Sequence, residues 1–349
     1  MSILVTGGAG YIGSVTVEAL RATRESVVVL DDLSAGHREA LSPDVTFYEG
    51  DVSDAPLLRN IAKRHNIEQV IHFAAFASVP ESVGEPLRYF GNNTCRLVEM
   101  LRVLRPCGLR SIVFSSTAAV YGEPQSPVID EEHQKRPCNP YGLSKYFAEQ
   151  ILDWSNTAYG ITHVALRYFN ASGALPKGAI SADSPARGED HRPEGHLIPL
   201  VLQTALGQRE RVSVFGTDYP TPDGTCVRDY VHVLDLADAH IKALRYLRDG
   251  GKSQKINLGN GKGFSVREVI ETARQITGRD IAVSLDARRP GDPSTLVAAH
   301  QKAAATLGWE PRYANLGDII QTAWDWHSDH PSGYVSSSLP PPVTKSAYE

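Results

Sequence analysis

The stretch MSILVTGGAGYIG, residues 1–13, decides the fold class of this chain. Residues 3–5 form a short apolar run that predicts a buried strand, and the apolar positions from Ile12 onward predict a helix. Gly7, Gly10 and Gly13 lie between the two. In doubly wound folds, a strand, a glycine-rich turn and a helix in this order receive a pyrophosphate, because small residues admit the phosphates and the helix N-terminus presents unpaired N–H groups.

The next apolar run, residues 26–30, ends in Asp31. A carboxylate at this position can accept hydrogen bonds from the ribose hydroxyls of adenosine, and it would repel a 2′-phosphate. Glycine spacing alone is common in many folds, so the acid at the end of the second strand is the stronger evidence. Together the two features predict a dinucleotide site that prefers NAD to NADP.

The composition is that of an ordinary globular protein: 349 residues, 42% hydrophobic, 21% charged and a net charge of −5. The length favours roughly two domains, and without a basic cluster we expect neither nucleic acid nor a membrane as partner. The four cysteines form no CxxC pair, which favours reduced thiols in the cytoplasm. The first strand begins at residue 3, so we expect no signal peptide, and no run approaches membrane-spanning length.

Strand and helix patterns alternate through the first part of the chain. Further strands are expected at residues 45–48, 69–75 and 111–116, with helices near 53–66, 80–90 and 92–105. This alternation predicts an α/β fold with a doubly wound parallel sheet, here a Rossmann domain over residues 1–173 to which some later segments return. Ligands bind beyond the carboxyl ends of such strands. The residues to inspect are therefore 7–13, 31–36, 51–52, 74–78 and 115–117.

Asn139-Pro140-Tyr141-Gly142-Leu143-Ser144-Lys145 opens the next helix, with Asn139 suited to the N-cap and Pro140 to the first turn. Tyr141 and Lys145 are four residues apart and share one helical face. A tyrosine with a pKa of about 10 is a poor base at neutral pH. A nearby ammonium group and a positive nicotinamide ring favour the phenolate, which can then take a proton from a sugar hydroxyl. Thr117, at the end of a strand, can hydrogen-bond the same substrate oxygen.

The second part of the chain predicts a smaller α/β domain over residues 174–331. A strand at 164–170 leads into a long segment, 174–196, that is rich in Pro, Gly and charge and favours a binding loop. Its two histidines, His191 and His196, have no third ligand at a recognisable spacing, so we expect no metal site. Strands are expected at 211–215, 227–233 and 255–258, and helices at 197–206, 234–248 and 265–277.

Two arginines in this part are candidates for binding a diphosphate. Arg228 lies in the expected strand 227–233, and Arg289 lies in the charged turn 288–293. The planar guanidinium can donate two hydrogen bonds at once to phosphate oxygens. The final residues, 332–349, carry serine and proline without apolar periodicity and are expected to be a disordered tail.

These motifs resemble those of one family, the UDP-glucose (UDP-galactose) 4-epimerases of the extended short-chain dehydrogenase/reductase group. The resemblance runs from residue 1 to about residue 330. It rests on VTGGAGYIG (5–13), VVVLDDLSAG (27–36), EGD (49–51), IHFAA (71–75), FSSTAAVYG (114–122), NPYGLSK (139–145), RYFNASGA (167–174), FGTDYPTPDGTCVRDYVHV (215–233) and RRPGD (288–292).

The resemblance assigns roles to matching positions. It implies that Tyr141 is the base, that Lys145 activates it and that Thr117 completes the catalytic group. It implies an NAD site formed by Gly7, Gly10, Tyr11, Ile12, Gly13, Asp31, Asp32, Leu33, Ser34, Ala35, Gly36, Asp51, Val52, Phe73, Ala74, Ala75, Ala77, Asn92, Thr117, Tyr141, Lys145 and Phe169. It implies a UDP-sugar site formed by Thr117, Tyr141, Asn170, His196, Leu197, Ser213, Val214, Phe215, Arg228, Arg289, Asp292 and Leu296.

Neighbouring residues separate this chain from related enzymes and from some members of the same family. Related sugar-nucleotide dehydratases and decarboxylases carry acidic residues just after the Ser/Thr, where this chain has Ala118 and Ala119. Ala77 lacks a lysine seen in some members near the cofactor diphosphate, and Arg96 replaces a common glycine. Leu296 stands where some members have a tyrosine beside the sugar 2-substituent, which suggests room for an N-acetyl group.

We therefore expect an NAD-dependent 4-epimerase that interconverts UDP-glucose and UDP-galactose through a transient 4-keto sugar, with UDP-GlcNAc and UDP-GalNAc as further candidate substrates. The resemblance also implies a homodimer packed through helices of the N-terminal domain. Two alternatives stay open: a 4-epimerase of UDP-pentose or UDP-uronate, and a non-catalytic dinucleotide sensor. The intact Thr117, Tyr141 and Lys145 count against the sensor, which has no use for a hydride-transfer relay.

Overall fold

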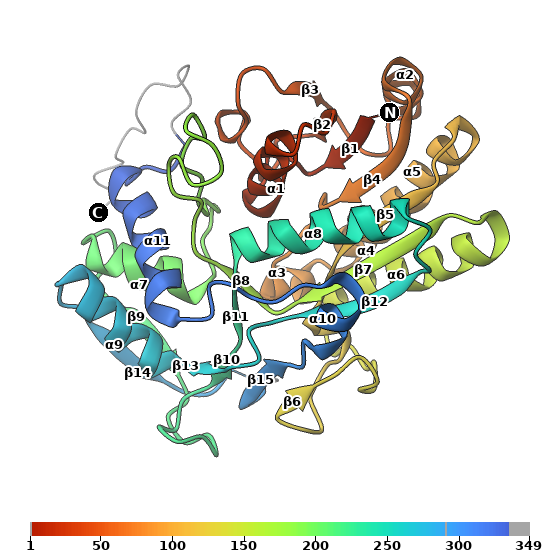
Figure 1. Ribbon diagram of the computed structural model, residues 1–349. Helices are drawn as coiled ribbons and strands as arrows, with labels where there is room; N and C mark the ends of the chain where they lie inside the picture. Colours follow the sequence, from red (N-terminus) through yellow and green to blue (C-terminus); the bar gives the residue numbers. More distant parts are fainter. Residues whose placement is uncertain (1, 290–291, 335–349) are drawn as a thin grey trace, which may run out of the picture.

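A computed structural model describes residues 2–289 and 292–334 of the chain. In these ranges seven parallel strands form one sheet in the order β12-β7-β5-β4-β1-β2-β3 (Figure 1). These strands are β1 (Ser2–Thr6), β2 (Val27–Asp31), β3 (Thr46–Glu49), β4 (Ile67–His72), β5 (Ser111–Thr117), β7 (Thr162–Tyr168) and β12 (Gln254–Leu258). The shorter strands are β6 (Val128–Ile129), β8 (Asn170–Ser172), β9 (Val212–Phe215), β10 (Val227–Arg228), β11 (Tyr230–His232), β13 (Phe264–Ser265), β14 (Val283–Asp286) and β15 (Thr295–Ala298).

The α-helices of the described residues connect and cover these strands. They are α1 (Tyr11–Ala22), α2 (Ala55–His65), α3 (Val79–Gly84), α4 (Pro86–Phe90), α5 (Arg96–Leu104), α6 (Pro140–Tyr159), α7 (Leu197–Ala205), α8 (Val233–Arg248), α9 (Val266–Thr277), α10 (Gln301–Leu307) and α11 (Leu316–Asp329). A π-helical turn, η2 (Gly91–Cys95), joins α4 to α5, and 3₁₀ turns are η1 (Arg38–Ala40), η3 (Arg105–Cys107) and η4 (Ala118–Val120).

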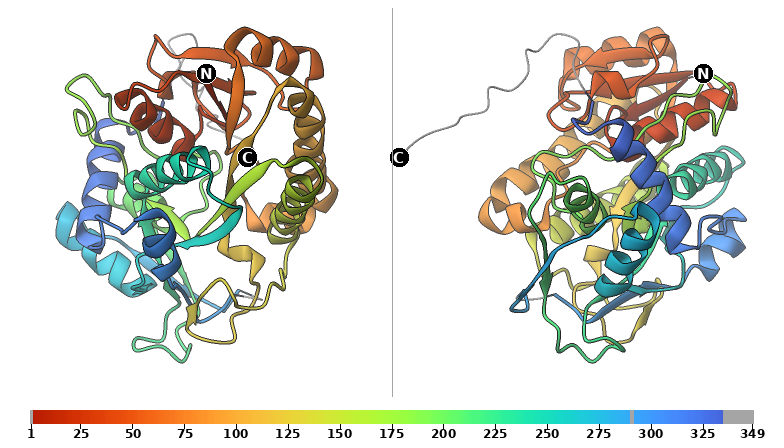
Figure 2. Two further views of the ribbon diagram at one scale, coloured as in Figure 1. Left: turned by 45° about the vertical axis from the view of Figure 1, so that its right-hand side comes forward. Right: turned by 90° about the vertical axis from the view of Figure 1, so that its left-hand side faces the viewer.

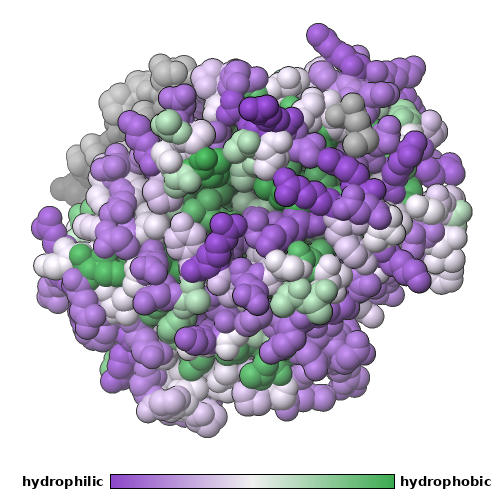
Figure 3. Space-filling model, in the orientation of Figure 1, coloured by the Kyte–Doolittle hydropathy of each residue, from purple (hydrophilic) through white to green (hydrophobic). Residues whose placement is uncertain are grey.

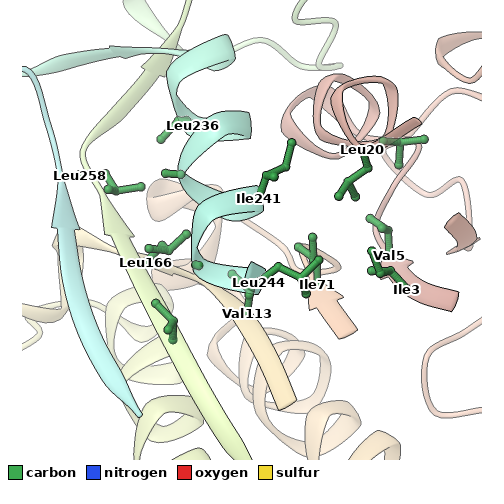
Figure 4. Close-up of a cluster of buried hydrophobic side chains, with 14 of the residues drawn as sticks. Ile3, Val5, Leu20, Ile71, Val113, Leu166, Leu236, Ile241, Leu244 and Leu258 are labelled. Carbon is green, nitrogen blue, oxygen red and sulfur yellow. The ribbon is translucent and has the colours of Figure 1, made fainter. Parts of the chain in front are cut away.

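Alternate residues of each central strand fill cores on opposite faces of the sheet. Ile3 and Val5 of β1 belong to the cluster beneath α1 and α8, whereas Leu4 belongs to the cluster on the other face with α2, α5 and α6. Figure 4 shows the first cluster, in which Leu236 and Leu244 of α8 approach the strands. Strands buried on both faces read as continuous apolar runs, which is why the sequence pattern predicted a parallel sheet.

The C-terminal part has its own apolar core, formed by α7, α9, α11 and the strands β9 and β11. The two parts exchange strands. β12 and α8, late in the chain, return to the large sheet, whereas β6, an early strand, joins the four-stranded sheet β13-β10-β15-β6. Figure 2 shows α5 and α6 on the side of the molecule away from α9 and α11. The doubly wound sheet with a smaller α/β region is the predicted fold class.

Several predicted elements differ from the structure in detail. The helix expected at 80–90 is divided at Glu85 into α3 and α4, because Pro86 begins a new first turn. The strand expected at 227–233 is divided at Asp229, so that β10 pairs with β13 and β15 while β11 pairs with β8. The strand expected at 69–75 is β4, which ends at His72. The helices α10 and α11 lie in a region for which no element was predicted.

The outer surface of the molecule is mixed in character. Figure 3 shows one face that is largely hydrophilic, with hydrophobic residues gathered in small areas. Among the described helices, none combines the length and the apolar character needed to cross a bilayer.

The C-terminal segment from residue 332 was expected to be a disordered tail. Within it, Tyr334 stacks on His37 with ring centroids 5.0 Å apart. Residues 335–349 lie outside the described ranges.

Candidate active site

The predicted cofactor residues lie along one edge of the large sheet, at the carboxyl ends of its strands. The strand order reverses between β1 and β4, which is where doubly wound folds open a crevice for a nucleotide. A Cβ on Gly7, whose φ is +68°, would meet the backbone nitrogen of Ala74 at 2.5 Å, and one on Gly13 would meet the Gly7 oxygen at 2.2 Å. Glycine is therefore required at both positions, and the close packing keeps the turn free of side chains where phosphates would approach.

Asp31 lies at the end of β2 with only 6% of its surface exposed. Its carboxylate accepts hydrogen bonds from the backbone N–H of Ala9 and of Leu33, each at 2.9 Å. Burial raises the pKa of this carboxyl, and the two backbone hydrogen bonds oppose that rise. One carboxylate thus ties the glycine turn to the loop after β2 and stands where an adenosine ribose would be recognised.

Arg96, the departure from the family pattern, occupies the other end of this edge. Its guanidinium lies 2.8 Å from Asp51 and 3.9 Å from Asp32, and it donates to Asn92 at 2.6 Å. Asp51, Asp32 and Asn92 are all predicted cofactor residues. The arginine therefore links three of them through one side chain, which a glycine could not do.

Asn93 was not assigned a role from the sequence, yet it is almost fully buried and connects three elements. Its side-chain oxygen accepts from the Phe76 N–H at 2.9 Å, and its nitrogen donates to the Phe76 oxygen at 3.0 Å and to Ser144 Oγ at 3.1 Å. Ser144 in turn donates to the Tyr141 carbonyl at 2.7 Å. This amide therefore fixes the first turn of α6 against the segment after β4.

The predicted catalytic residues converge at the ends of β5 and α6. Asn139 caps α6 by accepting from the Gly142 N–H at 2.8 Å, which places Tyr141 in the first turn. Thr117 ends β5, and its Oγ1 accepts from the Ala119 N–H at 3.1 Å. Burial raises the pKa of Tyr141, while its hydrogen bond with Thr117 acts to lower it. The sequence prediction that these two side chains meet is thus consistent with the geometry.

Lys145 is 2% exposed and lies one turn after Tyr141. Its Nζ donates to the Ser115 carbonyl at 2.9 Å and lies 4.9 Å from the centre of the Phe114 ring. Within the described ranges it forms no ion pair with a carboxylate, and burial lowers its pKa to about 7. The nearby His72 stays neutral, because burial and the Lys145 charge lower its pKa to about 3. Among the described residues, Lys145 thus has no neutralising anion, and its charged form is costly before a ligand binds.

A buried ion pair that the sequence analysis did not identify lies behind this group. Arg167 and Glu149 are 1% and 0% exposed, and their side chains are joined by bonds of 2.8 and 2.6 Å. Ser116 donates to Glu149 at 2.6 Å, and Arg167 donates to the Tyr121 hydroxyl at 2.9 Å. The network ties α6, β5 and β7 together directly beneath Thr117 and Lys145.

The predicted diphosphate residues lie in the C-terminal part and are more exposed. Arg228 of β10 pairs with Asp292, and the Arg289 guanidinium lies 3.7 Å from the centre of the Phe215 ring. Residues 290 and 291 of this turn lie outside the described ranges. Leu296 pairs with Arg228 in the register of β10 and β15. It packs against the buried cluster that follows Thr117, as does Phe169.

Asp229 explains how these strands keep their places. It is fully buried, and its carboxylate accepts from the backbone N–H groups of Asn260, Gly261 and Ala298 at 2.6, 3.1 and 3.1 Å. Its own carbonyl accepts from the Asn170 N–H at 3.0 Å. Asp229 therefore connects the ends of β12 and β15 through its side chain and the start of β8, where Asn170 is a predicted substrate residue, through its carbonyl.

The remaining predicted substrate residues lie on two elements. Ser213, Val214 and Phe215 belong to β9, and His196 and Leu197 stand at the N-cap and first position of α7. The sequence offered His191 and His196 no third ligand at a recognisable spacing, but the structure brings Glu189 and Glu194 next to both histidines. Their spacing, E-x-H-x-x-E-x-H, matches none of the common zinc motifs, so the loop conformation was needed to bring them together.

Comparisons with known proteins agree with this geometry. The NAD dependent epimerase/dehydratase family matches residues 3–259. A UDP-glucose 4-epimerase of Halalkalibacterium halodurans is 54% identical over 338 residues, covering 97% of this chain and 99% of the relative. One of Lacticaseibacillus casei is 51% identical over 334 residues, covering 96% and 99%. A solved UDP-glucose 4-epimerase from Brucella ovis in complex with NAD has a TM-score of 0.88 at 43% identity, covering 93% of this chain and 97% of that one.

Proposed function

The chain belongs to the NAD-dependent epimerase/dehydratase family, and we propose that it interconverts UDP-glucose and UDP-galactose by inverting carbon 4 of the sugar. The observation that carries this proposal is the arrangement of Tyr141, Thr117 and the buried Lys145 at the edge where the sheet would receive NAD. The residues present fit that cofactor, because the glycine turn is free of side chains and Asp31 is buried at the ribose position.

The proposed mechanism assigns one task to each of three side chains. NAD, when bound, supplies a hydride acceptor that later returns the same hydride. Tyr141, as phenolate, accepts the proton of the C4 hydroxyl and later gives it back to the 4-keto oxygen. Lys145 favours the phenolate through its charge, and Thr117 donates a hydrogen bond that holds the substrate oxygen. Inversion at C4 would require the bound sugar to present its opposite face to the cofactor between the two proton transfers of Tyr141.

The residues after Thr117 support epimerisation over elimination of water. Ala118 and Ala119 form the 3₁₀ turn η4 and carry no acid or base. Loss of water from the sugar requires such a pair beside the 4-keto intermediate. With methyl groups at these positions, neither Ala118 nor Ala119 could supply the acid or base needed to expel water from a bound sugar.

The experiment is to add UDP-galactose to the purified protein without cofactor and to follow UDP-glucose by NMR. Conversion without added NAD is expected and would establish both the reaction and a retained cofactor. Conversion of UDP-pentose or UDP-uronate alone would move the assignment to those substrates. Absence of conversion for every substrate, with NAD added, would favour the non-catalytic sensor.

Leu296 supports a second pair of substrates, UDP-GlcNAc and UDP-GalNAc. Its side chain packs beside Phe169 in the cluster next to η4, and it is shorter than the tyrosine found there in some relatives. We propose that this difference admits an N-acetyl group at C2. Leu296→Tyr is expected to reduce turnover of the N-acetylated sugars at least tenfold more than turnover of the plain hexoses; an unchanged ratio would contradict the proposal.

We also propose that the protein is a homodimer formed through α3, α4 and α6. Most of its exposed large hydrophobic residues gather on these helices: Val79, Val83, Leu87, Phe147, Trp154 and Tyr159. The three helices contact one another and lie on the side away from α9 and α11 (Figure 2). Light scattering should give twice the chain mass, and Leu87→Glu with Trp154→Glu should give a monomer. Val128→Glu, a change at an exposed hydrophobic outside these helices, is the control.

Two further proposals concern organisation and location. We propose that residues 174–331 act as the UDP-sugar-binding unit, since they carry all the candidate diphosphate residues.

We propose a cytoplasmic location, which the free cysteines support. Cys95 and Cys138 are exposed, and none of the four cysteines forms a disulfide within the described residues.

A further inference from the structure

Four side chains of the loop between β8 and α7 converge on one point. Glu189, His191, Glu194 and His196 each offer one ligand atom, and all of these atoms lie within 4.8 Å of one another. His196 Nδ1 lies 2.7 Å from Glu189 Oε1 and 3.1 Å from Glu194 Oε1. His191 Nδ1 lies 3.1 Å from Glu189 Oε1 and 3.9 Å from Glu194 Oε2.

Several of these separations are close to the distances between ligand atoms around a tetrahedral metal ion. Zinc binds imidazole nitrogen and carboxylate oxygen at about 2.0–2.2 Å, which separates the ligands of a tetrahedral ion by roughly 3.3–3.6 Å. The separations of 2.7, 3.1, 3.1 and 3.9 Å bracket that range. Small side-chain rotations would therefore place all four atoms at bonding distance from one ion.

The two carboxylates are buried, yet no lysine or arginine of the described ranges pairs with either of them. The Glu189 and Glu194 side chains are 6% and 5% exposed, and their ion-pair partners there are the two imidazoles. His191 Nδ1 is also buried and points toward both acids, and within the described residues it has no hydrogen-bond partner. Buried carboxylates and an imidazole nitrogen whose lone pair is free to ligate, gathered at one point, suit a bound cation.

The surrounding structure holds this loop in place from several sides. Leu175 and Arg187 pair across its base, and Arg187 donates to Glu18 and Ser42, each at 3.0 Å. His37 lies 3.3 Å from Asp190, next to Glu189. Glu194 Oε1 accepts from the backbone N–H of His196 at 2.8 Å, which leaves Oε2 directed at His191. The ligands thus start from a constrained geometry.

We propose that Glu189, His191, Glu194 and His196 bind one zinc ion that stabilises the loop and the start of α7. Two nitrogen and two oxygen donors suit a borderline ion such as Zn²⁺, and two carboxylates balance its charge. Four protein ligands make a closed site, which is typical of structural and not of catalytic zinc. The ion would hold His196 and hence Leu197, a predicted substrate residue, in place. This proposal reverses the expectation from the sequence.

The test is the metal content of untagged protein, purified from zinc-containing medium and measured by mass spectrometry. We expect one zinc per chain, located at the four side chains by anomalous diffraction at the zinc edge. After chelation, ZnCl₂ added back to the protein should bind in calorimetry, and His191→Ala and Glu189→Gln should each weaken it at least about tenfold, because even outer-sphere partners are worth that much. His133→Ala removes a half-buried histidine elsewhere and should bind zinc like the parent.

Less than a tenth of a zinc per chain with no uptake of ZnCl₂ would overturn the proposal, and the four groups would then be a proton-linked ion-pair cluster. Zinc bound equally by the parent, His191→Ala and Glu189→Gln would also overturn it, since the ion would lie elsewhere. The two variants are compared only after circular dichroism shows native folding. If both variants unfold, the test is the melting temperature of the chelated parent protein, which must rise when ZnCl₂ is added. Metal content is measured without sugar nucleotides, so its outcome is independent of the proposed reaction.

Discussion

The two sides of the candidate site hold their charged groups in opposite ways. On the N-terminal side, Lys145 is buried against a backbone carbonyl and an aromatic ring, with no ion pair among the described residues. On the C-terminal side, Arg228 is paired with Asp292, and Arg289 lies on the face of Phe215. The position of the Lys145 amino group is fixed by the fold before any ligand arrives. The second set is already satisfied by protein groups and must exchange partners when a diphosphate binds.

This contrast predicts where substitutions act. Changes on the N-terminal side should reduce the rate of the chemical step or the stability of the fold. Changes on the C-terminal side should weaken substrate binding and leave the chemistry nearly intact. The four predictions below test this division.

Tyr141→Phe should give the largest effect, a loss in kcat of about 10³–10⁴-fold, because it removes the group proposed to take the proton. Substrate affinity should change little, and the absorbance of bound cofactor should be retained. Steady-state kinetics with UDP-galactose would measure both constants. Tyr89→Phe is the matched control: its ring is 6.5 Å from that of Tyr141, but its hydroxyl donates to Glu81 at 2.8 Å. A Tyr141→Phe enzyme with a tenth of the parent kcat would contradict the assignment.

Arg167→Met should destabilise the fold by about 3–5 kcal/mol, because Glu149 would be left buried and charged without a partner. Urea denaturation would measure the loss. The double variant Arg167→Met with Glu149→Met should recover part of it, since no buried charge remains. On the other side of the site, Arg288→Met breaks an exposed contact with Asp218 and should leave stability almost unchanged. Equal losses of stability in Arg167→Met and Arg288→Met would contradict the proposed contrast between buried and exposed ion pairs.

The first of these regions was largely predictable from the sequence. The glycine turn, Asp31 and the Tyr141–Lys145 spacing are local patterns, and each is read from a few adjacent residues. The Glu149–Arg167 pair, Asn93 and Asp229 were not found, because their partners lie far away in the chain and only the fold brings them together. The same is true of Glu189 and Glu194, whose side chains meet the two histidines through a loop conformation that no helical or strand period encodes.

Lys145 should make stability depend on pH. An unfolded lysine has a pKa of about 10.4, whereas burial lowers that of Lys145 to about 7. Between these values the unfolded chain binds a proton that the native chain has released, so stability should rise with pH from 7 to 10. The contribution is up to about 3 kcal/mol. Denaturation would measure the free energy of unfolding of the parent and of Lys145→Met at equal cofactor content. The difference between the two values should become smaller from pH 7 to pH 10.

Lys242→Met is the control for this effect, because Lys242 is partly exposed and forms a surface pair with Asp238. The difference in free energy of unfolding between Lys242→Met and the parent should stay constant between pH 7 and pH 10. A constant difference for Lys145→Met as well would mean that the native protein holds Lys145 protonated throughout, and a neutralising group would then have to be sought on the N-terminal side.

Arg228→Ala should give the smallest of the four effects, an increase in KM of about 10–100-fold with kcat within a factor of about three, as expected for a lost charge-assisted bond. The loss of substrate affinity is limited because Arg228 must leave Asp292 to reach a phosphate. The binding free energy gained is only the difference between its contacts with these two partners. Arg288→Ala, which alters a neighbouring exposed arginine, should leave KM near the parent value.

The substitution also frees the Asp292 carboxylate, which would repel a diphosphate on its own account. Arg228→Ala with Asp292→Asn should therefore recover part of the lost affinity, and the part recovered measures the repulsion separately from the missing hydrogen bonds. A fall in kcat at unchanged KM would place Arg228 in the chemical step instead. That result would contradict the proposed contrast between an N-terminal side that performs the chemistry and a C-terminal side whose arginines exchange partners to bind substrate.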